Sequence, residues 1–223
     1  MKAKVGMVTI GQSPRVDVVP EMKRILGPRV QVMEAGALDG LSLEEVKKMA
    51  PVAGDYILVT LMRDGTPVTI GKSHILPRMQ NCIDDLTKKE AELIVLLCTG
   101  EFPEFASEKI IVRPDRLVNS VIRGILPEGT LGVVVPLSDQ IPQLGHKWVA
   151  LGLKVIVESA TPYGARDEVT SVAKKLASQS VDLVVLDCIG YNLKMKETMR
   201  KIMRKPVILS RSILARTIKE LLD

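Results

Sequence analysis

The chain has 223 residues, of which 46% are hydrophobic and 26% are charged, and its formal net charge is +5. This hydrophobic fraction is typical of a chain with a packed core and excludes a disordered one. The basic excess is small and is spread over pairs such as Lys47-Lys48 and Lys174-Lys175. Nucleic-acid binders concentrate such residues on one face and add stacking aromatics, so we expect no nucleic-acid partner.

The sequence also excludes a membrane-spanning protein, because no run approaches the roughly 18 continuous apolar residues that a helical span needs. The first apolar run ends at Gly11, which is too early for a signal peptide and predicts a first strand instead. Three cysteines without an even framework indicate free thiols in a reducing compartment. We therefore expect a cytoplasmic protein with no membrane partner.

Short β-branched segments alternate with amphipathic segments along the whole chain. This alternation predicts an α/β fold with parallel sheets flanked by helices. The predicted strands are Val5–Ile10, Val30–Glu34, Tyr56–Leu61, Leu93–Cys98, Gly132–Pro136, Val155–Glu158, Leu183–Cys188 and Val207–Ser210. Most of them are apolar throughout, as expected of strands that are buried on both faces.

Three local signals mark helices between these strands. Ser42 and Glu45 form a capping box, in which each side chain can satisfy a free amide of the first turn. Asp17 is a candidate N-cap for a helix that has Pro20 in its first turn. Residues 169–176 place apolar side chains at the i, i+3, i+4, i+7 positions of one helix face.

The two halves of the chain resemble each other weakly. Residues 4–10 and 131–137 both form glycine-marked first strands, and residues 91–98 and 181–188 both form later strands that end in cysteine. A true internal duplication explains this similarity. The general likeness of buried parallel strands explains it as well, and the sequence leaves both interpretations open.

Cys98 and Cys188 end two of the predicted strands and precede Thr99-Gly100 and Ile189-Gly190. Ligands of open α/β sheets bind beyond the carboxyl ends of the strands, where free amides at helix N-termini favour a thiolate. Either cysteine alone is readily explained as a small buried hydrophobe. Two cysteines at matching strand ends favour a functional site.

The third cysteine indicates packing, and the two histidines are expected to be structural or exposed. Cys82 shares a helical stripe with the apolar residues Met79, Ile83 and Leu86, which indicates a core position. His74 and His146 have no acidic or cysteine partners at metal-ligand spacing, so we expect no metal site.

Further polar residues follow predicted strands. Gln12, Ser13 and Arg15 come after the first strand, where the hydroxyl of Ser13 and the guanidinium of Arg15 could hold a carboxylate. Arg63 and Asp64 follow the third strand. Glycine and proline neighbours make a simple surface turn the alternative interpretation for both groups.

Three segments carry a family resemblance: 9–15 (TIGQSPR), 60–65 (TLMRDG) and 186–191 (LDCIGY). In order and spacing the chain resembles the AroM family over nearly its whole length. AroM proteins are in turn similar to the cofactor-independent aspartate, glutamate and hydantoin racemases. Those enzymes have two pseudo-symmetric lobes, and one cysteine from each lobe acts on opposite faces of the substrate's α-carbon as acid or base.

The resemblance implies two α/β lobes, residues 1–113 with 208–223 and residues 114–207. It also implies that Cys98 and Cys188 are the catalytic pair, with no metal and no cofactor. The resemblance places carboxylate donors beside the two cysteines, which adds Thr99, Gly100, Ile189 and Gly190 to the substrate-binding candidates Gln12, Ser13, Arg15 and Arg63 that follow predicted strands. The chain departs from the racemase pattern in two places: Thr99 follows Cys98 directly without the usual Asn, and Ile189 replaces a threonine after the second cysteine.

The leading functional hypothesis is therefore a cofactor-independent racemase or isomerase of a small carboxylate. A non-catalytic small-anion binding or regulatory protein is the main alternative, and a reversible disulfide between Cys98 and Cys188 is a third. The expected partners are a small carboxylate ligand and a second copy of the chain in a homodimer.

Overall fold

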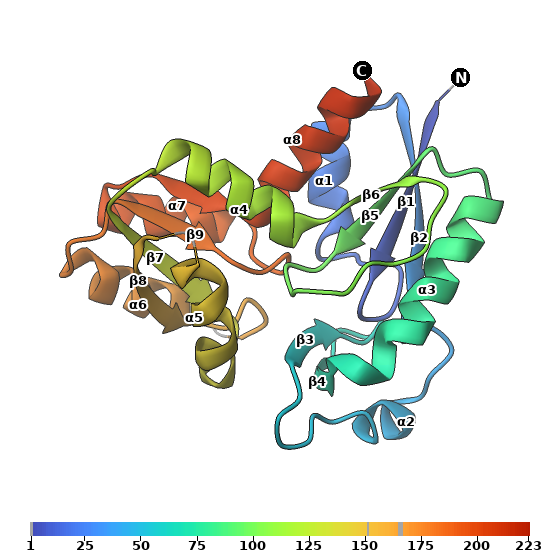
Figure 1. Ribbon diagram of the computed structural model, residues 1–223, viewed down its shortest axis with the longest axis horizontal. Coiled ribbons are helices and arrows are strands. Elements are labelled where there is room, and N and C mark those ends of the chain that lie inside the picture. Colours follow the sequence, from blue (N-terminus) through green and yellow to red (C-terminus); the bar gives the residue numbers. More distant parts are fainter. Residues whose placement is uncertain (1, 151, 165–166) are drawn as a thin grey trace. The chain divides into compact units, whose positions relative to one another are not determined.

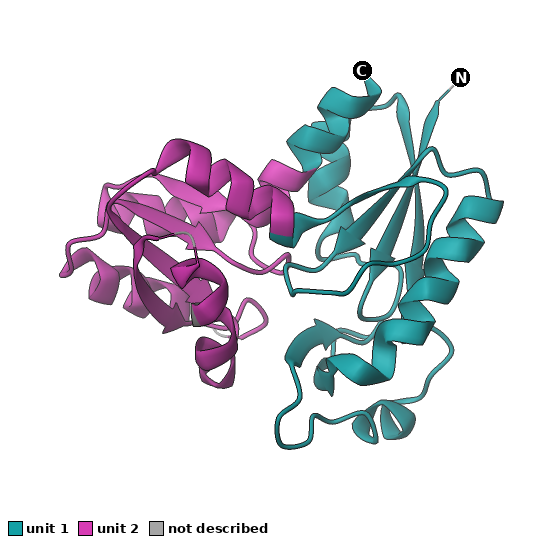
Figure 2. Cartoon of the chain, in the orientation of Figure 1, with its two compact units in different colours: residues 1–115, 215–223 teal, residues 116–214 magenta. Residues whose placement is uncertain are grey.

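The structure is a computed structural model that describes residues 2–150, 152–164 and 167–223. The chain divides into two compact units, coloured in Figure 2. Unit 1 contains the described residues up to Asp115 and the C-terminal segment Ala215–Asp223, and unit 2 contains Arg116–Leu214. The boundary between Leu214 and Ala215 falls inside helix α8 (Ser210–Leu222), so this one helix contributes residues to both units.

Unit 1 is built on a four-stranded parallel sheet with the order β2-β1-β5-β6 (Figure 1). Its strands are β1 (Ala3–Thr9), β2 (Val30–Gly36), β5 (Leu93–Leu97) and β6 (Ile110–Val112). Helix α1 (Val19–Leu26) contacts β2, and helix α3 (Lys72–Lys88) packs on β1, β2 and β5. The packing is close at Gly6, where an added Cβ would lie 2.9 Å from Ile94 and 3.0 Å from Leu86.

A β-hairpin is inserted between β2 and α3 of unit 1, after the short helix α2 (Leu43–Lys47). Strand β3 (Ile57–Leu61) pairs antiparallel with β4 (Pro67–Gly71) in a separate two-stranded sheet. The strand predicted at 56–61 is therefore present but belongs to no parallel sheet. Gly65 closes the hairpin with a φ of 89°, a conformation that glycine adopts without a Cβ penalty.

Unit 2 repeats this architecture with the order β10-β9-β7-β8, again all parallel. Its strands are β7 (Thr130–Val135), β8 (Lys154–Ser159), β9 (Leu183–Leu186) and β10 (Val207–Leu209). Its helical segments are α4 (Pro114–Ile125, which begins in unit 1), η1 (Ser138–Gln140), α5 (Ile141–Val149), α6 (Asp167–Ala177) and α7 (Leu193–Met203). Strands β7, β8, β9 and β10 occupy the places that β1, β2, β5 and β6 occupy in unit 1. The weak sequence repeat therefore coincides with a repeat of topology.

Two of the three local helix predictions are confirmed. Ser42 and Glu45 make both hydrogen bonds of a capping box at the start of α2, and the apolar stripe of residues 169–176 is the buried face of α6. The prediction for Asp17 is wrong: the N-cap of α1 is Val18, which makes no side-chain cap. The carboxylate of Asp17 instead binds the guanidinium of Arg15, which is a stronger, charge-assisted partner than a backbone amide.

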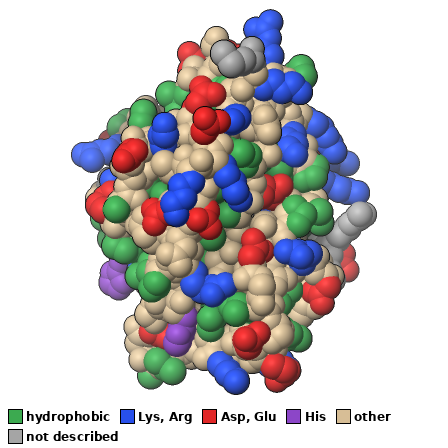
Figure 3. Space-filling view, turned by 90° about the vertical axis from the view of Figure 1, so that its right-hand side faces the viewer, with side chains coloured by type: hydrophobic (Ala, Val, Ile, Leu, Met, Phe, Trp, Pro, Cys, Tyr) green, Lys and Arg blue, Asp and Glu red, His purple; other side chains and the backbone are tan. Residues whose placement is uncertain are grey.

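Among the described residues, no helix combines the length and the apolar character that crossing a membrane requires. On the face that Figure 3 presents, Lys and Arg side chains are interspersed with Asp and Glu side chains. This mixture fits the small net charge of the sequence.

Candidate functional site

Cys98 lies directly beyond Leu97, the last residue of β5, in unit 1. Leu97 is paired with Thr9 of the neighbouring strand β1, so the segments after β1 and β5 leave the sheet at the same edge. The half-buried sulfur accepts a hydrogen bond from the backbone N–H of Gly100, with a distance of 3.4 Å. A backbone N–H aimed at sulfur stabilises a thiolate more than a thiol, because the anion is the stronger acceptor.

Cys188 has the corresponding environment in unit 2. It follows the end of β9 by two residues, and its half-buried sulfur accepts the backbone N–H of Gly190 at 3.3 Å. The turn is crowded, since a Cβ at Gly190 would lie 2.6 Å from the Tyr163 hydroxyl and 2.8 Å from Pro162. The two thiols thus occupy equivalent strand ends, and each is hydrogen-bonded by the amide of the glycine two residues later.

The predicted substrate-binding residues beside the cysteines differ between the units. Thr99 is almost fully buried, with 5% of its surface exposed, and carries a hydroxyl next to Cys98. Ile189 is 2% exposed and is packed as a core residue, so the position after Cys188 offers only backbone polar groups. The two cysteine turns thus differ, because the position after Cys98 carries a hydroxyl and the position after Cys188 does not.

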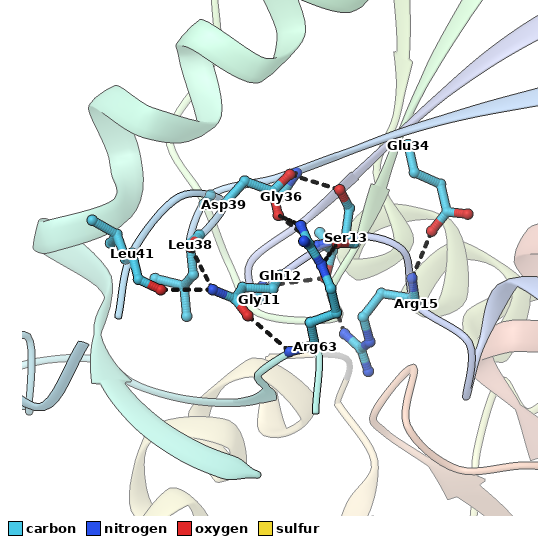
Figure 4. A network of polar contacts seen from close by, with 12 residues as sticks. Gly11, Gln12, Ser13, Arg15, Glu34, Gly36, Leu38, Asp39, Leu41 and Arg63 are labelled. Carbon is cyan, nitrogen blue, oxygen red and sulfur yellow. Dashed lines mark hydrogen bonds and ion pairs between the residues drawn. The ribbon is translucent and has the colours of Figure 1, made fainter. Parts of the chain in front are cut away.

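Three of the residues predicted after β1 and β3 meet in one polar network (Figure 4). The Gln12 amide donates to the carbonyls of Leu38 and Leu41, and its oxygen accepts the backbone N–H of Arg63 at 2.8 Å. The Arg63 Nε donates to the carbonyl of Ser13 at 2.7 Å. These bonds tie the segment after β1 to the segment after β2 and to the β3–β4 turn.

Asp39 is the centre of that network. Its carboxylate accepts the Ser13 backbone N–H at 2.7 Å, the Ser13 hydroxyl at 2.6 Å and the Gly36 N–H at 2.8 Å. The guanidinium of Arg63 lies 3.6 Å away. Donors of this kind would serve a ligand carboxylate equally well, and in this structure the side chain of Asp39 occupies them.

Arg15, the third predicted residue after β1, is buried, with 3% of its surface exposed. Its guanidinium binds both carboxylate oxygens of Asp17, at 2.8 and 2.7 Å. One of its terminal nitrogens also donates to the hydroxyls of Thr9 and Thr60 at 3.0 and 3.3 Å. Arg15 therefore binds side chains of its own unit, within the same region as the network around Asp39.

A buried ion pair immediately precedes Cys188. The Lys147 ammonium, on α5, lies 3.0 Å from Asp187, and their side chains are 1% and 0% exposed. The indole N–H of Trp148 donates to the same carboxylate at 2.9 Å. Since a buried charge is tolerated only when it is paired and hydrogen-bonded, this cluster fixes the end of β9 against α5.

Cys82 packs against the core of unit 1, as predicted, and neither histidine is buried. Cys82 lies in α3 beside the core residues Met79, Ile83 and Leu86, and burial raises the pKa of its thiol to about 11. His74 and His146 are both exposed. Within the described part of the chain, no three His, Cys, Asp or Glu side chains are grouped so as to hold a metal ion.

The sequence matches the family model of the AroM protein over residues 5–222. The chain belongs to the AroM family. A comparison with curated protein sequences found no match.

Solved structures show which enzymes share the fold of this AroM family member. The maleate cis-trans isomerase of Nocardia farcinica superposes with a TM-score of 0.69 at 15% identity, over 99% of this chain and 92% of that one. A liganded variant of arylmalonate decarboxylase gives a TM-score of 0.64 at 12% identity, over 99% and 92% of the two chains. The aspartate racemase of Picrophilus torridus gives 0.59 at 13% identity, over 99% and 94%. At these identities the likeness establishes the racemase-like fold.

Sequence reasoning missed the residues that hold the candidate site in place. Asp39 lies three residues beyond the end of β2, and a polar side chain at such a strand end was the available signal. Lys147 lies in a helix that the sequence did not single out. It gave no local signal, because its partner Asp187 is forty residues away along the chain.

Proposed function

We propose that this AroM family protein is a cofactor-independent racemase or isomerase of a small carboxylate. Cys98 and Cys188 would be the two acid/base groups. The observation that carries the proposal is the matched environment of the two thiols. Each lies at the carboxyl end of an equivalent strand, and each sulfur accepts the N–H of the glycine two residues later.

In the racemase reaction, one cysteine thiolate takes the α-proton of the substrate and becomes a thiol. The electron pair of the C–H bond is left on the α-carbon, next to the carboxylate. The other cysteine then gives its thiol proton to the opposite face of that carbon and becomes a thiolate. The configuration is inverted. The substrate has lost one proton to the first cysteine and gained one from the second, so its composition is unchanged. The Thr99 hydroxyl and backbone N–H groups of the two turns are the proposed carboxylate donors.

A thiolate in the same place can also act as a nucleophile on an unsaturated dicarboxylate. Its addition to the activated double bond leaves a single bond, rotation and loss of the thiolate then give the other geometric isomer, and no external reagent is consumed. The fold is shared with both a racemase and a cis-trans isomerase, so both reactions belong in the first test.

The test incubates the full chain in deuterated buffer with acidic amino acids, hydroxy acids, hydantoins and maleate. Proton NMR reports loss of the α-proton signal or appearance of the trans isomer. Cys98→Ser and Cys188→Ser should each abolish the reaction, and Cys82→Ser should leave it unchanged, because Cys82 is a packing residue of α3. No turnover on the whole panel by fully reduced protein would refute the proposal for these substrates.

The second candidate function is small-anion binding without catalysis, and one observation favours it. The buried Ile189 gives the second thiol no neighbouring side-chain hydroxyl of the kind that Thr99 provides beside Cys98, so the two thiols are not equally equipped for two-base catalysis. A protein of this kind would bind a carboxylate in titration calorimetry without exchanging its α-proton. The same substrate panel therefore separates the two functions.

A further inference from the structure

The first turn of α8 holds both sides of the Cys188 segment. The Ser210 hydroxyl donates to the carbonyl of Leu186 at 2.9 Å, ahead of the cysteine. The Arg211 guanidinium donates to the carbonyl of Ile189 at 2.9 Å and to that of Gly190 at 3.0 Å, behind it. Arg211 is only 1% exposed, so these bonds are made out of water.

The location of Arg211 is unfavourable for a cation taken by itself. The N-terminal turn of a helix carries a partial positive charge, so a positive side chain there is destabilising. Burial of the guanidinium adds a desolvation cost. A buried arginine is stable in such a place when its planar fork is held by specific acceptors, and here two successive carbonyls of the cysteine turn are among them.

The same turn contains a donor to the Cys188 sulfur, the N–H of Gly190. The carbonyl of Ile189 and the N–H of Gly190 belong to the same planar peptide unit and point in opposite directions. Fixing the carbonyls of Ile189 and Gly190 therefore fixes the direction in which this N–H points. We propose that Arg211 is a positioning residue for Cys188, which holds the Ile189–Gly190 peptide so that its N–H faces the sulfur.

Unit 1 has a comparable arginine at the equivalent strand end. Arg113 follows β6 as Arg211 follows β10, and it is 8% exposed. It donates to the carbonyls of Phe102 and Pro103 at 2.5 and 3.3 Å and pairs with Asp115 at 2.9 Å. It thus binds the chain four and five residues after Cys98, whereas Arg211 binds the chain one and two residues after Cys188. Arg113 is the matched comparison for the test.

The inference rests on the proposed function for its meaning, but its test needs no substrate. The rate of alkylation by iodoacetamide is followed from pH 6 to pH 10 in the full chain. The three cysteines fall in different tryptic peptides, so mass spectrometry gives a separate profile for each. Arg211→Lys keeps the positive charge on a single donor nitrogen but loses the planar fork that reaches two carbonyls. Arg216→Lys is the control, because it makes the same change at an exposed arginine of the same helix.

In Arg211→Lys we expect the midpoint of the Cys188 profile to rise by about one pH unit, which is a roughly tenfold loss of rate at neutral pH. Cys98 should be unchanged, and Arg216→Lys should match the unsubstituted chain. Arg113→Lys should leave Cys188 unchanged. A folded Arg211→Lys protein with an unaltered Cys188 profile would overturn the proposal, as would an equal shift of all three cysteines.

The unsubstituted chain gives a second measurement that does not depend on the folding of any variant. A Cys188 midpoint below that of Cys82, whose pKa burial raises to about 11, is the expected result. A midpoint at or above that value would overturn the proposal. Because these readings involve no substrate, they can succeed when the substrate panel fails and can fail when it succeeds.

Discussion

The two units of the chain share a strand order and a cysteine position but differ in the polar groups that follow their strands. In unit 1 these groups form a network between loops, whose members Asp39 and Arg63 have side chains 33% and 61% exposed. In unit 2 the ion pair of Lys147 and Asp187 is 1% and 0% exposed and lies inside the unit. The same topology therefore combines with two kinds of polar support, one partly solvated and one fully buried.

This difference predicts unequal sensitivity to mutation, and the largest effect is expected in unit 2. Lys147→Met leaves the buried carboxylate of Asp187 without its ion-pair partner, which typically costs about 3–5 kcal/mol of the free energy of unfolding. Urea denaturation followed by tryptophan fluorescence measures it, since Trp148 lies in the same cluster.

Lys47→Met is the control for this substitution. Its ion pair with Glu44 is exposed on both sides, so the expected loss is below about 1 kcal/mol. Equal losses in Lys147→Met and Lys47→Met would contradict the view that unit 2 depends on a buried pair.

An intermediate effect is expected from Asp39→Ala in unit 1. The substitution removes the acceptor of the Ser13 and Gly36 donors, and the expected loss is about 1–3 kcal/mol because water can replace part of the interaction at this half-exposed place. Thermal unfolding reports the loss. If Asp39→Ala destabilises the chain more than Lys147→Met does, the comparison between a solvated and a buried network is wrong.

The smallest effect concerns Cys82 and its dependence on pH. Burial raises the pKa of its thiol from 9.0 to about 11, so the folded chain holds this proton more tightly than the unfolded chain does. The stability associated with that proton is fully present below pH 9 and is lost as the pH rises from 9 toward 11. At pH 8 we expect Cys82 to be alkylated more slowly than Cys98 and Cys188. Faster labelling of Cys82 would contradict its assignment as a packing residue.

Much of the architecture could be predicted because it depends on local patterns. Apolar runs bounded by turn residues located seven of the eight strands of the parallel sheets and missed only the three-residue strand β6, and the motifs around residues 9–15 and 186–191 identified the family. The strand at 56–61 shows the limit of this reasoning. Its composition predicts a strand but does not say which strand it pairs with. It pairs with β4 across the turn at 62–66 and therefore lies outside the parallel sheets.

The sequence by itself determined the fold class, the family and the two cysteines at strand ends, because hydrophobic periodicity and short motifs are properties of neighbouring residues. The tertiary structure decided which polar groups meet. Asp39 reaches Ser13, Lys147 reaches Asp187 and Arg211 reaches the Ile189–Gly190 turn across more than twenty residues of chain in each case. Such pairs form only after the sheets and helices have brought distant segments together, since the cost of ordering them is offset by packing elsewhere.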